Sequence, residues 1–416
     1  MILWNETKSV PISRQMVWGA YKKVKANKGK AGIDSVSMEE FDADRSKYLY
    51  KLWNRLASGS YFPPPVKEVE IPKDDGKLRK LGIPTISDRV AQMVIKEYLE
   101  PRFEEVFSPD SYGYRPSKSA HHALQAVRLN CKRSDWVIDL DIKGFFDNID
   151  HSKLLLAVKK HVPEKWCLLY IERWLKAPVQ SKSGSLIEKQ GKGTPQGGVI
   201  SPLLANLFLH YGMDKWLDRN HPSVKYVRYA DDAILHCRSK PHAEYVLRSL
   251  QYRMEECKLE LHPEKTKLVY CRDYRRTEKF PVVKFDFLGF SFQPRTTSSK
   301  EAGKLFVGYD CAISIKSKKR IADKLEALDF EKLSFHCIVG IAGYLNPFIR
   351  GWVNYYGKYR KSALHPVFRI LSQRIVRWAR KRYKRYKTSL KKAYNWLEQI
   401  REQFPNLFYH WQLGFK

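Results

Sequence analysis

Paired cysteines, long apolar runs and acidic residues are scarce in this 416-residue sequence. Its seven cysteines include no Cys-x-x-Cys pair, so we expect neither a zinc site nor a disulfide framework, and a reducing cytosol is the default compartment. No apolar signal-peptide core follows Met1–Trp4, and no run approaches the roughly 18 apolar residues that a membrane-spanning helix needs. The sequence therefore predicts a soluble, intracellular protein without a membrane partner.

The shortage of acid is the strongest compositional signal. Against 44 Asp and Glu stand 76 Lys and Arg, which gives a net charge of +32 and a pI near 9.7. Such an excess indicates a polyanionic partner. Aromatic residues make up 13% of the chain and many lie beside Lys or Arg, a combination that favours nucleic acid over a membrane surface. A purely solvated basic face is the less favoured interpretation.

One short acidic stretch, Tyr229-Ala230-Asp231-Asp232, lies between two apolar runs. This pattern predicts a β-hairpin with an acidic turn, although a lone Asp-Asp pair more often only caps a turn. Upstream, residues 136–142 alternate so that Asp139 and Asp141 share one face of a predicted strand. We place Asp141 in the same site as the turn and give Asp139, one pleat earlier, a structural role.

Adjacent carboxylates repel one another, and a hard divalent cation with oxygen ligands is the usual compensation. Two strands that each deliver an acid could hold a pair of metal ions, as in-line phosphoryl transfer requires. Phe145 follows Asp141 by four residues and is bulky enough to occupy the space of a ribose 2′-hydroxyl. Its neighbour Phe146 fits a core aromatic.

Three further residues suit a nucleotide. Gln196 is followed by two glycines that let the backbone approach a substrate closely, so its amide could contact nucleotide or template. Lys73 and Arg79 lie in a predicted hairpin, and their cations suit a triphosphate. Taken alone, the glycine loop would be a plain turn and the two cations would be solvated.

Around these residues the chain alternates between predicted helices and strands, which indicates an α+β sheet. The predicted hairpin spans 66–71 and 78–83, and residues 285–292 read as one strand followed by a loop at 295–300. The remaining predicted elements are helices over 88–107, 120–127, 151–161 and 241–258 and one that begins at Ser201-Pro202.

Several short blocks occur in a fixed order over most of the chain and are specific as a set. They are Gly32-Ile33-Asp34, Ile71-Pro72-Lys73, Arg79 to Pro84, Tyr112 to Pro116, Asp141 to Asp147, Gly193 to Gly198 with Ser201-Pro202-Leu203, Tyr229 to Asp232, Glu264-Lys265-Thr266, and Phe287 to Phe290. In these blocks the chain resembles reverse transcriptases of the bacterial group II intron type.

The resemblance implies a right-hand polymerase with fingers, a palm with an antiparallel sheet, and a helical thumb. It implies that Asp141, Asp231, Asp232 and the carbonyl of Ile142 bind two Mg²⁺ ions, for which Mn²⁺ could substitute. The implied nucleotide contacts are Lys73, Arg79, Ile142, Lys143, Gly144, Phe145 as the gate against ribonucleotides, Gln196, and Lys265 near the leaving pyrophosphate. The implied primer grip is Phe287, Leu288, Gly289 and Phe290.

The C-terminal third resembles the maturase, or X, domain in the segment from Gly343 to Tyr356, which in the family binds intron RNA. Residues 351–416 carry 16 Lys or Arg against two Glu. Val367, Leu371, Ile375, Trp378 and Tyr386 form a predicted apolar helical stripe. The cations expected to bind RNA lie off this stripe: Arg374, Arg377, Arg380, Lys381, Arg382, Lys384 and Arg385.

The expected division is an N-terminal extension with fingers (1–136), a palm (137–300) with a fingers segment near 165–195, a thumb or X domain (301–375) and a basic helical tail (376–416). We expect no HNH nuclease, because the cysteine-bearing appendix of many relatives is missing, so any retrohoming would need a primer made elsewhere. The expected partners are an RNA template, a DNA or RNA primer, deoxynucleoside triphosphates and group II intron RNA. The expected location is the cytoplasm, with the nucleoid.

The leading hypothesis is an RNA-directed DNA polymerase with a maturase role in splicing. Two alternatives stay open. One is a free-standing relative recruited to DNA repair or phage defence, which the DNA flanking the gene would distinguish. The other is a non-catalytic RNA chaperone with vestigial carboxylates, against which the intact acids and the Gln196 loop argue. A viral-type RNA polymerase is disfavoured, because Phe145 would obstruct ribonucleotides.

Overall fold

The computed structural model describes residues 9–72, 76, 78–298, 305–330 and 337–415. Two compact units form the fold. The N-terminal unit comprises Met1–Asn130 and Trp136–Leu268, and the C-terminal unit comprises Cys131–Asp135 and Val269–Lys416. The predicted α+β class is confirmed, and the finer division into fingers, palm, thumb and tail stays a prediction. Within the described ranges, no helix combines the length and apolar character needed to cross a membrane.

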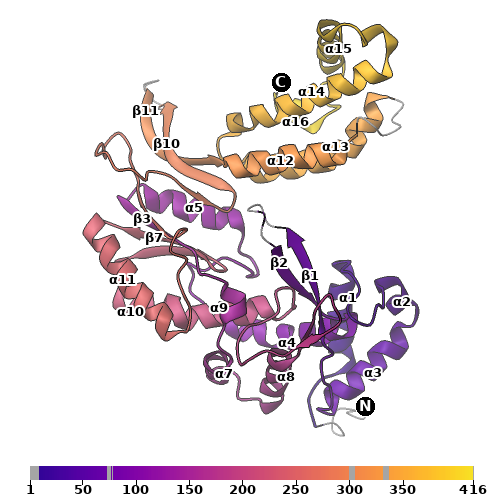
Figure 1. Ribbon diagram of the computed structural model, residues 1–416, viewed down its shortest axis with the longest axis vertical. Helices are drawn as coiled ribbons and strands as arrows, with labels where there is room; N and C mark the ends of the chain where they lie inside the picture. The colour runs from indigo at the N-terminus through magenta and orange to yellow at the C-terminus, as the bar shows by residue number, and fades with distance from the viewer. Residues whose placement is uncertain (1–8, 73–75, 77, 299–304, 331–336, 416) are drawn as a thin grey trace. The chain divides into compact units, whose positions relative to one another are not determined.

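The N-terminal unit contains two sheets and most of the helices (Figure 1). Its helices are α1 (Arg14–Ala26), α2 (Met38–Ala43), α3 (Arg45–Ala57), α4 (Ile86–Glu104), α5 (Ala120–Cys131), α6 (Phe145–Asn148), α7 (His151–Lys159), α8 (Lys165–Lys176), α9 (Ser201–Leu209), the π-helix η1 (His210–Asp214), α10 (Lys215–Asn220) and α11 (Lys240–Glu256). The predicted helices of this unit are therefore confirmed to within a few residues at their ends.

The first sheet has the strand order β2-β1-β4-β5. Its strands are β1 (Val66–Pro72), β2 (Leu78–Ile83), β4 (Val179–Gln180) and β5 (Leu186–Ile187). β1 and β2 form the predicted antiparallel hairpin, with Ile71 opposite Arg79, and β1 pairs in parallel with β4. The sheet therefore places Arg79 on an exposed arm.

The second sheet has the order β6-β7-β3-β8. Its strands are β3 (Trp136–Leu140), β6 (Lys225–Tyr229), β7 (Asp232–Cys237) and β8 (Lys267–Tyr270). β7 pairs antiparallel with both β6 and β3, and α11 packs on β3 and β7. Val137, Ile138 and Ile234 are fully buried, so apolar packing fixes the strands in one register.

A buried carboxylate joins the helices beneath the first sheet. Asp88 of α4 accepts hydrogen bonds from Tyr61 Oη at 2.8 Å, Trp174 Nε1 at 2.7 Å and Gln92 Nε2 at 2.9 Å. Gln92 Oε1 in turn accepts from the backbone N–H of Ile200 at 3.3 Å. The start of α9, and the loop that precedes it, are thereby tied to the helical layer.

The C-terminal unit begins with a three-stranded sheet in the order β11-β10-β9, formed by β9 (Phe285–Phe287), β10 (Phe290–Ser298) and β11 (Leu305–Ile313). The prediction of one strand over 285–292 is wrong, because Leu288 and Gly289 have φ values of +48° and +79° and turn the chain back on itself. The predicted loop at 295–300 is also wrong for residues 295–298, which extend β10. Its last two residues lie outside the described ranges.

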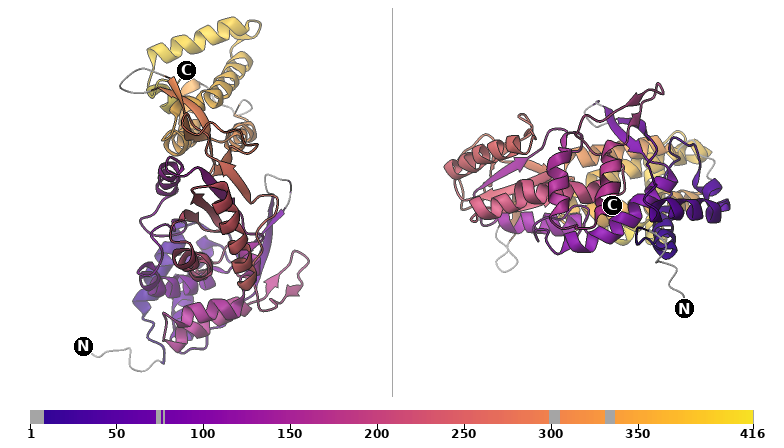
Figure 2. Two further views of the ribbon diagram at one scale, coloured as in Figure 1. Left: turned by 90° about the vertical axis from the view of Figure 1, so that its left-hand side faces the viewer. Right: turned by 90° about the horizontal axis from the view of Figure 1, so that it is seen from below.

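The rest of the C-terminal unit is helical, and Figures 1 and 2 show its helices in orange to yellow. They are α12 (Ile315–Leu328), α13 (Ile338–Tyr356), η2 (Lys361–Leu364), α14 (His365–Arg382), η3 (Lys384–Tyr386), α15 (Leu390–Gln403) and α16 (Tyr409–Gln412). The predicted stripe is confirmed, since Val367, Leu371, Ile375 and Trp378 of α14 and Tyr386 of η3 lie in one buried cluster.

Candidate active site

The acidic turn lies where β6 meets β7. Ala230 adopts a left-handed conformation with φ of +58°, and Asp231 completes the turn before Asp232 opens β7. Leu140, the last residue of β3, pairs with Ala233 of β7. Asp141 follows Leu140 and Asp232 precedes Ala233. The antiparallel register therefore places these two acids opposite each other at the same edge of the sheet. The predicted hairpin is confirmed.

Burial and neighbouring negative charge raise the pKa values of the two acids of the turn. Desolvation raises the pKa of Asp232 to about 7, with further contributions from the charges of Asp231 and Asp141. Desolvation and Asp141 also raise the pKa of Asp231, and the positive charge of Arg79 opposes that rise. Lys265 Nζ lies 2.9 Å from Asp141 Oδ2 and supplies positive charge to the cluster. The site thus concentrates negative charge that the protein compensates only in part.

The donor chemistry of this cluster fits a hard divalent cation, because carboxylate oxygens are the ligands that Mg²⁺ prefers. Across the residues that the structure describes, no three His, Cys, Asp or Glu side chains already stand in a metal-binding group. Asp141 Oδ2 is instead engaged by Lys265. Ile142, whose carbonyl was predicted to join the metal shell, pairs through its backbone with Leu261, and its side chain is buried.

The backbone of Asp141 is fixed from the segment before β8. His262 N–H donates to the Asp141 carbonyl at 2.8 Å, and Lys143 N–H donates to the carbonyl of Glu260 at 2.9 Å. Lys143 Nζ also pairs with the Glu260 carboxylate at 2.9 Å. Asp139 pairs with Ile234 in the register and is half-buried, and its structural role stays a prediction.

Phe145 begins α6 after Gly144, which has a φ of +55°. The Phe145 ring is 2% exposed and lies 5.4 Å from the ring of Phe146 and 6.3 Å from that of Phe208. Both phenylalanines are therefore packed in the interior. Phe145 is held by its packing four residues after Asp141 in the chain, and its role as a steric gate stays a prediction.

Arg79 and Gln196 meet although 117 positions separate them. Arg79 Nε donates to Gln196 Oε1 at 2.6 Å, and the N–H of Gly82 donates to the Gln196 carbonyl at 2.7 Å. A Cβ on Gly197, whose φ is +118°, would lie 2.4 Å from the Gly82 carbonyl, so only glycine allows this approach. The structure brings these two predicted residues together, whereas Lys73 lies outside the described residues.

A family model described as reverse transcriptase (RNA-dependent DNA polymerase) matches residues 71–292, more than half of the chain. The chain belongs to this reverse transcriptase family. A second model, the group II intron maturase-specific domain, matches residues 319–396. Reverse transcriptases generally use divalent metal ions, which agrees with the donor set.

Similarity to curated proteins agrees with this family membership. Protein YkfC of Escherichia coli K12 is 33% identical over 279 residues, which cover 58% of this chain and 73% of YkfC. The group II intron-encoded protein LtrA of Lactococcus lactis subsp. cremoris is 28% identical over 420 residues, covering 81% of this chain and 68% of LtrA. A putative COX1/OXI3 intron 1 protein of Saccharomyces cerevisiae is 26% identical over 319 residues, covering 64% and 38%.

A cavity of about 190 Å³ is lined by Gln196 and by Lys189, a residue to which the sequence analysis assigned no role. Lys189 lines it together with Lys80, Lys192 and Asp147. Burial lowers the pKa of Lys189 to about 8, and its Nζ has no hydrogen-bond partner among the described residues. Nothing in the local sequence marks this lysine, because only the folded β4–β5 segment brings it beside the loop.

Tyr114 is a second residue to which the sequence analysis gave no role. Desolvation and the charge of Asp231 raise its pKa, and Arg79 opposes the rise. Tyr114 therefore lies near both the acidic turn and Arg79, although its side chain is half exposed. Its place in the Tyr112 to Pro116 block was the available signal.

The predicted primer grip lies in the C-terminal unit, at the turn between β9 and β10. The Gly289 carbonyl accepts from Ser314 N–H at 3.0 Å and Ser317 Oγ at 2.9 Å, and the Leu288 carbonyl accepts from Tyr355 Oη at 2.9 Å. Phe287 and Phe290 are buried. Hydrogen bonds from α12, its N-cap residue and α13 thus hold the backbone of the turn, and its contact with primer stays a prediction.

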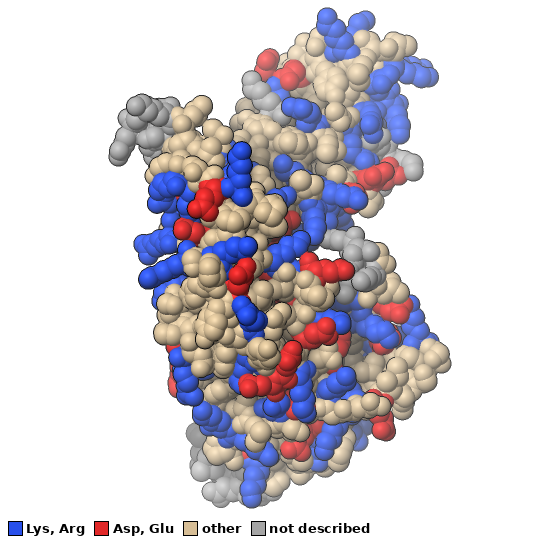
Figure 3. Space-filling model, turned by 60° about the vertical axis from the view of Figure 1, so that its left-hand side comes forward, with Lys and Arg blue, Asp and Glu red and all other residues tan. Residues whose placement is uncertain are grey.

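The predicted RNA-binding cations gather at the end of α14. A hollow of about 740 Å³ is lined by Arg377, Arg380, Lys381, Arg382, Lys384 and Lys387. Figure 3 shows Lys and Arg outnumbering acidic side chains over these helices. Lys387 was not predicted. The remaining two predicted cations lie on aromatic rings, Arg374 on Phe330 at 5.7 Å and Arg385 on Tyr386 at 4.6 Å.

The raised pKa of Asp232 predicts a pH-dependent response to metal. Because the pKa is raised on folding, the stability that this group contributes falls as the pH rises from about 4 to about 7. A bound cation favours the ionised form, so Mg²⁺ should raise the melting temperature more at pH 8 than at pH 6. Differential scanning fluorimetry with NaCl of equal ionic strength as the control measures this shift. Equal shifts at both pH values, or an unchanged shift in Asp232→Asn, would contradict it.

Proposed function

We propose that this protein is an RNA-directed DNA polymerase in which Asp141, Asp231 and Asp232 hold two divalent metal ions. The observation that carries the proposal is the register of β3 on β7, which brings carboxylates from segments ninety residues apart to one edge of a sheet. When bound, the ions would activate a primer 3′-hydroxyl and stabilise the triphosphate. Burial and the repulsion between neighbouring carboxylates raise the pKa values of Asp231 and Asp232, and a bound cation would offset both effects, which supports the proposal.

The chain's own residues have distinct parts in this proposal. Arg79, held by Gln196, would pair with phosphate oxygens, since a guanidinium binds phosphate through charge-assisted hydrogen bonds. Lys265, which pairs with Asp141, would turn to the leaving pyrophosphate. Phe145 would press against the sugar and exclude a 2′-hydroxyl. In this proposal the side chains of Arg79 and Lys265 contact phosphate groups, and the ring of Phe145 contacts the ribose.

For the C-terminal unit we propose binding of structured RNA, including group II intron RNA. The basic hollow at the end of α14 supports this, because clustered cations on one surface attract a phosphate backbone. LtrA, by its name, is encoded by a group II intron. A polymerase that acts free of any intron would use the same surface for its template.

Asp231→Asn should abolish primer extension on an RNA template. The substitution removes one negative charge from the metal-binding cluster and leaves side-chain size unchanged, so folding should be preserved. Extension with the four deoxynucleotides, followed by gel electrophoresis, measures the rate, which we expect to fall by about 10³-fold or more. Circular dichroism checks folding, and near-normal synthesis by a folded variant would refute the metal role.

Phe145→Val should increase incorporation of ribonucleotides relative to deoxynucleotides. The smaller side chain vacates the space of the 2′-hydroxyl while keeping an apolar residue in a buried position. Phe146→Val is the matched control, because it makes the same change at the adjacent buried ring. Competition between the two nucleotide types on one template gives the selectivity, and equal selectivity in the two variants would remove the gate assignment.

Neutralising Arg377, Lys384 and Lys387 to Gln should weaken RNA binding and flatten its salt dependence. All three are exposed and line the hollow, and each lost phosphate contact should reduce the slope of log K against log salt by about 0.7 to 0.9. Fluorescence anisotropy between low and high salt measures the slope. Neutralising Lys316, Lys319 and Lys324 of α12 makes the same charge change elsewhere, and equal effects would show that the hollow has no special role.

A further inference from the structure

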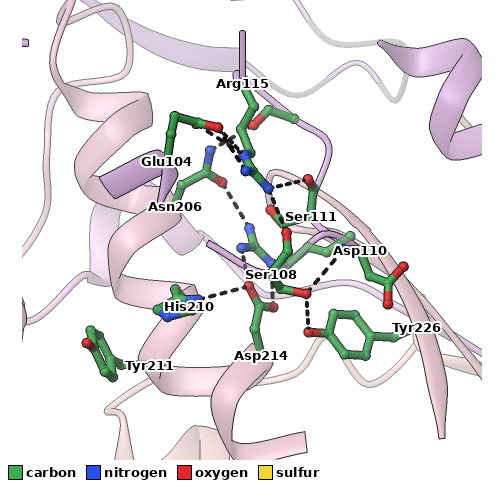
Figure 4. Close-up of polar contacts among 12 residues, drawn as sticks. Glu104, Ser108, Asp110, Ser111, Arg115, Asn206, His210, Tyr211, Asp214 and Tyr226 are labelled. Carbon is green, nitrogen blue, oxygen red and sulfur yellow. Dashed lines mark hydrogen bonds and ion pairs between the residues drawn. The ribbon is translucent and has the colours of Figure 1, made fainter. Parts of the chain in front are cut away.

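Beneath the acidic turn lies an ion pair that is completely buried. Arg228 of β6 and Asp214 at the end of η1 are both 0% exposed. Arg228 Nε lies 2.8 Å from Asp214 Oδ1, and Arg228 Nη2 lies 2.5 Å from Asp214 Oδ2, a two-pronged arrangement that fixes the plane of the guanidinium. Figure 4 shows Asp214 with Asn206 and His210 along one helical run.

The third guanidinium nitrogen reaches the turn itself. Arg228 Nη1 donates to the carbonyl of Ala230 at 3.0 Å and to Asn206 Oδ1 at 2.9 Å. Ala230 is the residue immediately before Asp231, and its φ of +58° is costly for a side chain larger than glycine. The hydrogen bond from Arg228 to its carbonyl therefore stabilises the left-handed conformation of Ala230.

A second contact clamps the same residue from the side. Asn206 Nδ2 donates to the carbonyl of Gly113 at 2.7 Å, and a Cβ on Gly113 would lie 2.4 Å from the backbone nitrogen of Ala230. The backbone of Arg228 is bonded on this side too, donating to the Asp110 carbonyl at 2.9 Å and accepting from Tyr112 N–H at 2.8 Å. Asn206 thus connects the buried arginine to the loop at Gly113, which abuts the turn.

Stability alone does not account for such a pair. Removing two charges from water costs several kcal/mol per ion, and apolar residues of similar volume often give an equally stable core. What apolar residues cannot do is direct a donor at the Ala230 carbonyl. The arrangement therefore points to a role in geometry.

We propose that Arg228, oriented by Asp214 and Asn206, is a positioning residue that fixes the Ala230 carbonyl and with it the direction in which Asp231 and Asp232 face. This inference rests on the proposed polymerase function, since the turn matters only if its carboxylates bind metal. It adds three residues to that function, none of which touches substrate.

Two variants test the proposal in the full-length protein. Asn206→Leu keeps nearly the same volume but removes both the acceptor for Arg228 and the donor to Gly113. Arg228→Lys keeps the charge beside Asp214 but lacks the planar fork that reaches the Ala230 carbonyl at the same time. The matched control is Tyr226→Phe, which deletes a buried hydrogen bond to Ser108 Oγ from the same strand without touching the turn.

We expect both test variants to need about threefold to tenfold more Mg²⁺ for half-maximal primer extension, and to lose about tenfold in kcat with KM for deoxynucleotides nearly unchanged. Tyr226→Phe should match the wild type in all three quantities. A merely structural loss would lower the folded fraction without changing the Mg²⁺ requirement of the molecules that stay folded. Folded variants with wild-type Mg²⁺ dependence and kcat would overturn the proposal.

Mn²⁺ binding measured by electron paramagnetic resonance, without nucleic acid or nucleotide, separates this inference from the polymerase assignment. A wild type that binds Mn²⁺ but makes no DNA would refute the polymerase function alone, and weaker Mn²⁺ binding by Asn206→Leu would still support the positioning role. Unchanged Mn²⁺ affinity in that variant would refute it. Should Arg228→Lys fail to fold, Asn206→Leu decides the outcome, because it removes no charge.

Discussion

Repulsion among three carboxylates is the constraint on which the rest of the N-terminal unit depends. Asp231 and Asp232 are adjacent in the chain, and the register of β3 on β7 adds Asp141 to them. A slip of one residue in that register would send Asp141 to the opposite face of the sheet. The fully buried side chains of Val137, Ile234 and their neighbours prevent the slip, so the apolar core fixes the electrostatics of the site.

The acidic site is a small negative region in a protein with a net charge of +32. The positive surface attracts nucleic acid in general, whereas the carboxylates repel it locally unless their charge is neutralised. Lys265 beside Asp141 and Arg79 near Asp231 supply part of that neutralisation from the protein itself. Part of the negative charge of the cluster is thus left uncompensated by the protein itself.

Local patterns predicted the parts of the fold that local interactions determine. The β1–β2 hairpin, the acidic turn and the stripe on α14 all follow from alternation or helical spacing, and the structure confirms them. The break at Leu288 and Gly289 was missed because the aromatic alternation continues across it, and only the glycine gave a signal.

The rest of the site could not be predicted, because it depends on contacts between distant segments. Arg79 and Gln196 were each predicted to contact the nucleotide, but no local pattern indicated that they bond to each other. Lys189 and the Arg228–Asp214 pair carry no local signature, since their meaning comes from burial and from partners on other elements. The family resemblance indicated which residues to expect in the site. The structure adds the contacts that hold those residues in place.

The π-helix η1 sets the direction in which Asp214 lies on its helical run. It holds five residues, His210–Asp214, between two α-helical segments, and a π-turn contains one residue more than an α-turn. Each residue of a π-turn rotates the chain by less than the roughly 100° of an α-helical residue. The π-turn therefore sets the angle between Asn206 and Asp214, which both bond Arg228. The orientation of the arginine depends on the hydrogen-bond pattern of this helical run as well as on which residues it contains.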